Sequence, residues 1–240
     1  MEKISLKGNG EIREGRIEME VPHLEETLTF VLPLHGPNYQ PTVMNEISGQ
    51  GLARPTTAQT FSLIDLAMQN PDERHCSEIL KRFKQNYLWT STESLSFPQG
   101  VIVYDNVNGD MPQTSSELMK LAEAGDERAR FVERGFETGD RSISSWLKHP
   151  YVLAQLGSAE QAEKMLLVVE RVAKQVNKRI AWAYGLNSSD SDVKRYTAVY
   201  DYGGRLILYG DYGDYNRSGY AAGVLKTGEA SRAKPKVSKK

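Results

Sequence analysis

The sequence has few of the features that would place the protein in a specialised class. One cysteine among 240 residues allows neither an intramolecular disulfide nor a zinc site built from cysteines. No apolar run approaches the roughly 20 residues of a membrane-spanning helix. A net charge of −1 argues against non-specific nucleic-acid binding by the whole chain. With no signal peptide visible at the N-terminus, we expect a globular protein in the cytoplasm.

The small net charge combines two unequal parts. Residues 226–240 hold six basic residues and one acidic residue, a net charge of +5, which leaves −6 for residues 1–225. A basic segment poor in apolar residues is predicted to be disordered. It either keeps the protein soluble or attaches weakly to an anionic surface such as nucleic acid or a membrane. We therefore predict one domain over 1–225 and a basic tail over 226–240.

Alternating apolar residues, and β-branched or aromatic runs, predict strands towards both ends of the chain. The predicted strands cover residues 11–34, 88–93, 100–105, 196–202, 205–209 and 218–225. Gly203–Gly204 predicts a tight hairpin turn, because the favoured turns need positive φ. Segment 35–41, rich in glycine and proline, is expected to interrupt regular structure.

Capping signals predict two helices between these groups of strands. Thr56, followed by Gln59, has the spacing of a capping box, and Asn70–Pro71 is expected to begin the second helix. Cys76 falls on the apolar face of that second helix. We expect it to be a packed core residue rather than a nucleophile.

Residues 106–194 are predicted to form a long insertion that is mainly helical. Thr114 is expected to begin one helix and His149–Pro150 a short one. Ser158, with Gln161 three residues later, is expected to begin the longest helix, which runs to about residue 176.

The order of elements and three motifs resemble the C-type-lectin-like fold, which also occurs in the formylglycine-generating-enzyme superfamily. Arg54-Pro55-Thr56 resembles the helix start of bacterial lectin-like domains, although a leucine is missing after Arg54. Segment 88–93, Leu-Trp-Thr-Ser-Thr-Glu, is similar to their YWTSTE strand, and segment 216–224 is similar to their closing strand. The chain also resembles an uncharacterised group of archaeal and archaeal-virus proteins.

This resemblance implies an α+β fold with a mixed or antiparallel sheet, two helices and a long helical insertion. Segments 28–34 and 218–224 would pair as adjacent strands and so close the domain. Ligands of such folds usually bind in the long-loop region, which here corresponds to 106–194. The cysteine pair of the formylglycine enzymes has no counterpart, because Cys76 is alone.

Residues 196–220 have the most unusual composition, with seven of the 12 tyrosines and five glycines. Tyrosine offers rigid amphipathic contacts at low entropic cost, as in antibody paratopes. The composition also resembles the target regions of diversity-generating retroelements, whose lectin-like proteins vary towards Tyr, Asn, Asp, Ser and Gly. Alternatively, the tyrosines cover a sheet face and pair across strands. The candidate ligand-binding residues are Tyr200, Tyr202, Arg205, Asp211, Tyr212, Asp214, Tyr215, Asn216 and Arg217.

No local motif announces a catalytic or metal site. The four histidines are far apart in sequence, and no nucleophile elbow or phosphate loop is present. Segment 211–216 could offer oxygen ligands to Ca²⁺, but its spacing is not that of an EF-hand, so we predict no cofactor.

The sequence therefore favours a non-catalytic module that binds a protein or glycan through an aromatic surface near the C-terminus. One alternative is a small-molecule enzyme with its site between the helical insertion and the sheet. Another is a virion-associated structural protein that assembles through an exposed strand edge. Nucleic-acid contact is expected only through the basic tail, and no insertion into a membrane is expected.

Overall fold

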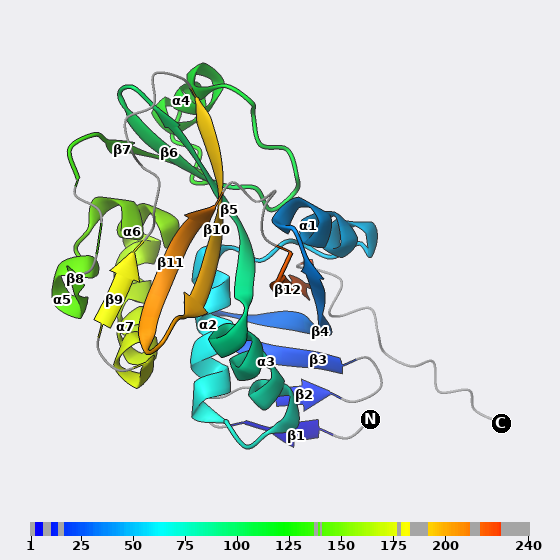
Figure 1. The fold of residues 1–240 in the computed structure, drawn as a ribbon. Coiled ribbons are helices and arrows are strands. Elements are labelled where there is room, and N and C mark those ends of the chain that lie inside the picture. Colours follow the sequence, from blue (N-terminus) through cyan, green and yellow to red (C-terminus); the bar gives the residue numbers. More distant parts are fainter. Residues whose placement is uncertain are drawn as a thin grey trace.

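The computed structural model describes most of the chain, namely residues 3–6, 11–13, 17–136, 139, 141–176, 179–182, 192–211 and 217–226. Figure 1 shows a long twisted sheet with helices packed on its faces. Within the described ranges, no helix is long and apolar enough to cross a membrane.

The elements alternate along the chain. The strands are β1 (Lys3–Ser5), β2 (Glu11–Arg13), β3 (Ile17–His23), β4 (Glu26–Asn38), β5 (Tyr87–Phe97), β6 (Gly100–Asp105), β7 (Ala129–Glu133), β8 (Arg141–Ser142), β9 (Arg179–Trp182), β10 (Val193–Asp201), β11 (Arg205–Asp211) and β12 (Gly219–Val224). The helices are α1 (Gln40–Gly49), α2 (Thr57–Gln69), α3 (Arg74–Gln85), α4 (Ser115–Glu123), α5 (Ile143–Trp146), α6 (Pro150–Gln155) and α7 (Ala159–Val176).

The strands form a single 12-stranded sheet in the order β1-β2-β3-β4-β12-β5-β10-β11-β9-β8, with β6 and β7 branching from β5. Most neighbours are antiparallel, while β12 is parallel to β5 and β9 is parallel to β11. β12 pairs with β4, placing Gly223 opposite Val31 and Val224 opposite Phe30. The expected pairing of segments 28–34 and 218–224 is thus confirmed.

Helices cover both faces of the sheet, as the alternation along β4 shows. Phe30 and Leu32 are buried in a cluster with side chains of α2 and α3, whereas Val31 lies in another cluster with side chains of α1. Because successive side chains of a strand point to opposite faces, α1 must lie across the sheet from α2 and α3. Helices α6 and α7 share a third cluster with α2 and with Leu88 of β5.

Several local signals act as the sequence predicts. Thr56 and Gln59 form both hydrogen bonds of a capping box at the start of α2. Tyr202 and Arg205 exchange backbone hydrogen bonds of 2.9 and 3.2 Å around Gly203–Gly204, whose φ angles are 59° and 78°. Positive φ at both central residues is what a type I′ turn requires.

Cys76 is fully buried among side chains of β3, β4 and α2, as expected of a core residue. Burial, reinforced by Glu73, raises the pKa of its thiol to about 12. The reactive thiolate is therefore scarce at neutral pH.

Two predicted boundaries are wrong. Regular structure does not break at 35–41, because β12 supplies a pairing partner as far as Asn38 and α1 begins immediately afterwards. The third helix does not begin at Asn70–Pro71. Asn70 instead ends α2, and Glu73 caps α3 by accepting a hydrogen bond from the Cys76 N–H at 2.7 Å.

The insertion 106–194 is helical as expected but also contributes strands. Helices α4, α6 and α7 begin at or next to the predicted caps. β7 pairs with β6, and β9 pairs with β11, so the insertion extends the sheet at two places. The tail predicted over 226–240 lies outside the described residues beyond Lys226.

Candidate ligand-binding face

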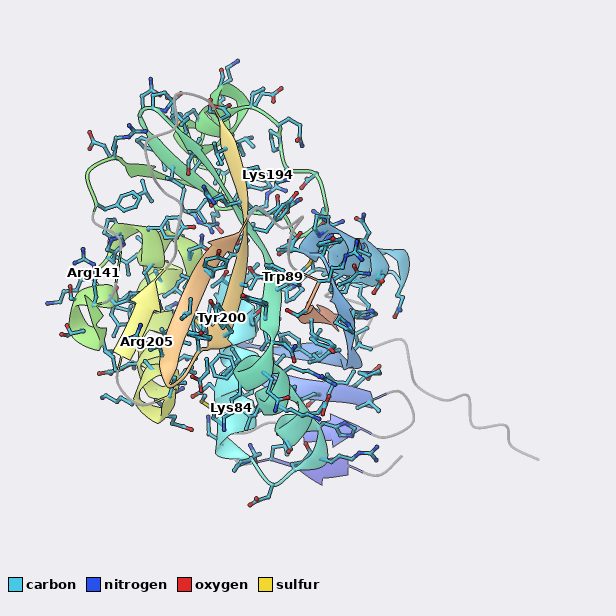
Figure 2. All side chains as sticks on the ribbon, viewed as in Figure 1. Lys84, Trp89, Arg141, Lys194, Tyr200 and Arg205 are labelled. Atoms are coloured by element: carbon cyan, nitrogen blue, oxygen red, sulfur yellow. The ribbon has the colours of Figure 1, made fainter. Side chains whose placement is uncertain are left out.

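Four tyrosines from neighbouring segments gather on one face of the sheet. They are Tyr87 on β5, Tyr200 on β10, Tyr202 in the turn after β10 and Tyr209 on β11, and we call them the aromatic face. Ala198 of β10 stands opposite both Trp89 and Tyr209. Residues opposite one another in a sheet share a face, so the register brings these rings together. Figure 2 shows Tyr200 and Trp89 on this part of the molecule.

The rings are in contact with one another. The centroids of Tyr87 and Tyr200 lie 4.5 Å apart at an interplanar angle of 62°, and Tyr209 lies 6.3 Å from each of them. Tyr202 lies 6.4 Å from Tyr200 at 64°. These are favourable aromatic geometries, so the rings hold one another in place.

Exposure increases across this cluster. Trp89, stacked 5.6 Å from Tyr87, is fully buried and packs with side chains of α1. Its indole N–H donates to the Asn38 carbonyl at 3.0 Å. Tyr87, Tyr200 and Tyr209 are half-buried, and Tyr202 is 68% exposed. The buried tryptophan thus anchors a set of rings that opens towards solvent.

The phenol of Tyr200 stays protonated at neutral pH. Burial and the neighbouring hydroxyl of Tyr87 raise the pKa of Tyr200 above its ordinary value. The ring therefore presents a neutral hydroxyl, which can both donate and accept a hydrogen bond.

A second aromatic contact lies at the neighbouring strand ends. Arg217 donates from Nε to the Tyr39 hydroxyl at 2.5 Å, and its guanidinium sits 4.8 Å from that ring's centroid. Gly219 pairs with both Asn38 and Tyr87. The pair formed by Tyr39 and Arg217 therefore flanks the aromatic face on the β4–β12 side.

The structure places the predicted site residues in three ways. Tyr200 and Tyr202 belong to the aromatic face, and Arg205 is exposed at the start of β11 (Figure 2). Arg217 lies apart from them, against Tyr39. The backbone of Asp211 ends β11. Predicted residues Tyr212, Asp214, Tyr215 and Asn216, with the Ca²⁺ hypothesis for that segment, lie outside the described residues.

Sequence reasoning left Tyr87, Trp89 and Tyr209 out of the site. A signal was available, because Tyr87-Leu88-Trp89 puts two aromatics at i and i+2 and hence on one face of a strand. The strand pairing that brings them to Tyr200 joins segments more than 100 residues apart.

The polar part of the 88–93 motif has a structural role. Thr90 lies 3.1 Å, oxygen to oxygen, from Thr57 at the start of α2. The hydroxyls of Thr57 and Thr197 both donate to Gln155 Oε1, at 3.2 and 3.1 Å. These bonds tie α2, β5, β10 and α6 together. Among the described residues, no group of three His, Cys, Asp or Glu could hold a metal ion.

Comparison with known proteins bears on the fold. No protein-family model matches the sequence, and no curated protein matches it. A solved structure from Nanoarchaeota, described as the accommodation of massive sequence variation by the C-type lectin fold, is similar to this chain. The match covers 78% of this chain and 93% of that one, with a TM-score of 0.53 and 17% sequence identity. The chain thus has an α+β C-type lectin fold, as its element order indicates.

Proposed function

We propose that this chain is a non-catalytic binding module that contacts a partner protein through its aromatic face. The carrying observation is the set of four touching tyrosines, which runs from half-buried Tyr87 to exposed Tyr202. Tyrosine and arginine are the residues that most often carry binding energy in protein interfaces. Arg205 and Arg217 flank the tyrosines.

The ring packing favours recognition because it lowers the entropic cost of binding. Tyr200 contacts three other tyrosines, so little side-chain freedom is left for a ligand to remove. We include Tyr212, Asp214, Tyr215 and Asn216 in the proposed surface, because their segment connects β11 to β12. A glycan is the alternative ligand, since sugars also stack on tyrosine rings.

The nanoarchaeal structure supports a recognition role. Its description attributes massive sequence variation to the C-type lectin fold. A scaffold that tolerates variation suits a surface whose side chains are selected for binding. We propose the same use of the scaffold here, in segment 196–220, which is rich in Tyr, Gly and Asp.

A photo-crosslinking side chain placed at position 202 tests this proposal in cells that express the protein. Position 167 on α7 is the matched control, because Leu167 is 66% exposed and lies outside the aromatic face. We expect a partner that is crosslinked from 202 but not from 167, and whose binding Tyr200→Ala/Tyr202→Ala abolishes.

Stability decides what a loss of binding means. Tyr202→Ala should change the free energy of unfolding by no more than about 0.5 kcal/mol, as for other exposed side chains. Equal crosslinking from both positions, or loss of the fold in Tyr202→Ala, would contradict the proposal. Binding to a glycan array that depends on Tyr202 would instead favour the glycan alternative.

A further inference from the structure

A hollow of about 1070 Å³ lies within the insertion, between β7 and helices α5, α6 and α7. Its lining includes no residue of the aromatic face. A volume of this size is at the upper end of those that hold small organic ligands. The hollow therefore has to be considered separately from the proposed protein-binding surface.

Positive charge is concentrated around this hollow. Its charged lining residues are Arg130, Arg134, Arg141 and Lys148, against Glu133 and Glu163. The excess of two positive charges occurs in a chain whose residues 1–225 carry a net −6. Figure 2 shows Arg141 beside α5, at the edge of the molecule. Such a local reversal of charge attracts anions.

One of these cations is fixed in place and the others are available. Arg130 pairs with Asp105 at 2.5 Å and donates from Nε to the Ala154 carbonyl at 2.9 Å. Its side chain is 11% exposed, and its Nη2 has no hydrogen-bond partner. Arg134 donates only to the Phe97 carbonyl, and Lys148 forms no ion pair within the described ranges.

The remaining wall is apolar. Phe136, Leu153 and Leu166 line the hollow together with Pro150. The Phe136 ring is held edge-on to His149 at 5.3 Å and lies 6.0 Å from the ring of Tyr151. A ligand in this hollow would meet donors on one part of its surface and carbon on the rest.

We propose that the hollow binds a small organic diphosphate. Arg134, Arg141 and Lys148 together call for a group with more than one negative charge, and guanidinium groups bind phosphate oxygens in bidentate fashion. The N-terminal end of α7 also lines the hollow and adds its positive dipole. The apolar wall would hold the organic part, either a nucleoside or a hydrocarbon chain.

Isothermal titration calorimetry of the full chain at low ionic strength tests this inference. The probes are ADP, geranyl diphosphate, pyrophosphate and adenosine. We expect ADP or geranyl diphosphate to bind more tightly than both pyrophosphate and adenosine, and whichever binds identifies the organic part. Arg134→Gln/Lys148→Gln should weaken that binding about tenfold or more.

Two control variants make the result decisive. Lys84→Gln/Lys120→Gln removes the same charge from exposed positions on α3 and α4, outside the hollow, and should leave binding unchanged. Tyr200→Ala/Tyr202→Ala should also leave it unchanged, so this inference can fail or hold independently of the proposed function. Failure of both organic diphosphates to bind, or equal weakening by either control, would overturn the inference.

Discussion

Gly219 sets how closely β12 can approach the aromatic residues of β5. A Cβ at this position would stand 1.7 Å from the indole nitrogen of Trp89, which is fully buried. Gly219→Ala must therefore displace the ring and disturb its hydrogen bond to the Asn38 carbonyl. We expect the free energy of unfolding, measured in urea, to fall by about 1–3 kcal/mol.

Gly49→Ala is the control for this substitution. Gly49 ends α1, and a Cβ there would meet no atom within 4 Å. The change should leave stability the same or raise it by up to about 1 kcal/mol, because alanine is the better helix former. If both variants were equally stable, Trp89 would have room that the structure does not show.

His23 makes stability depend on pH at mildly acidic values. The ring is buried beside the Ser62 hydroxyl, with Nδ1 2.9 Å from its oxygen, and burial lowers its pKa from 6.5 to about 4. Between these values the unfolded chain binds a proton that the folded chain does not, so stability falls as the pH falls from 6.5 towards 4. The loss from this group is on the order of 3 kcal/mol at most.

The measurement is urea unfolding at pH 7 and pH 4.5 for the wild type and for His23→Gln. Glutamine cannot titrate, so the variant should lose less stability on acidification. His75→Gln on α3 should lose as much as the wild type, since His23 remains. An identical pH dependence for His23→Gln and the wild type would refute the assignment.

At the scale of elements, α7 joins the insertion to the body of the fold. Met165 is fully buried, and its sulfur accepts a hydrogen bond of 3.9 Å from Ser62 of α2. Further along, Arg171 binds both carboxylate oxygens of Asp65, at 3.1 and 2.7 Å. The side chains that face α2 therefore hold α7 in place.

Two alanine substitutions on α7 test this contact. Met165→Ala should lower the free energy of unfolding by about 2–5 kcal/mol, because it leaves a cavity against α2. Leu167→Ala should change it by less than about 0.5 kcal/mol, since Leu167 is 66% exposed. A similar small effect for both would mean that the insertion folds without support from α2.

Elements with a strong local signal were predicted, and those that depend on a distant partner were not. The capping boxes of α2 and α7 use residues three apart, which sequence alone displays. Helix α1 lacks a side-chain cap and follows a strand that β12 extends to Asn38. The short strand β9 depends likewise on β11, its parallel partner.

The site follows the same rule at the scale of the whole molecule. Composition singled out segment 196–220, and the alternation in β10 predicted that Tyr200 and Val199 face opposite ways. That Tyr87 joins Tyr200 follows only from the register between β5 and β10. The hollow lined by Arg134 and Lys148 likewise needs β7 and three helices to be assembled.

Closure of the sheet by β12 is what makes the whole chain one folding unit. β12 lies between β4 and β5, and all six of its residues are buried. Burying side chains such as Tyr220 and Val224 contributes about 1.5–3 kcal/mol each, against a typical domain stability of about 5–15 kcal/mol. Removing this strand would also leave two hydrophobic edges unpaired in the middle of the sheet.

Two truncations test this closure. A chain that ends at Lys226 keeps β12 and should unfold cooperatively at the same temperature as the full chain. A chain that ends at Arg217 loses β12 and should show no cooperative thermal transition by circular dichroism, because β4 and β5 lose the strand that joins them. Cooperative melting of this shorter chain near the full-length temperature would show that the two halves of the sheet fold without closure.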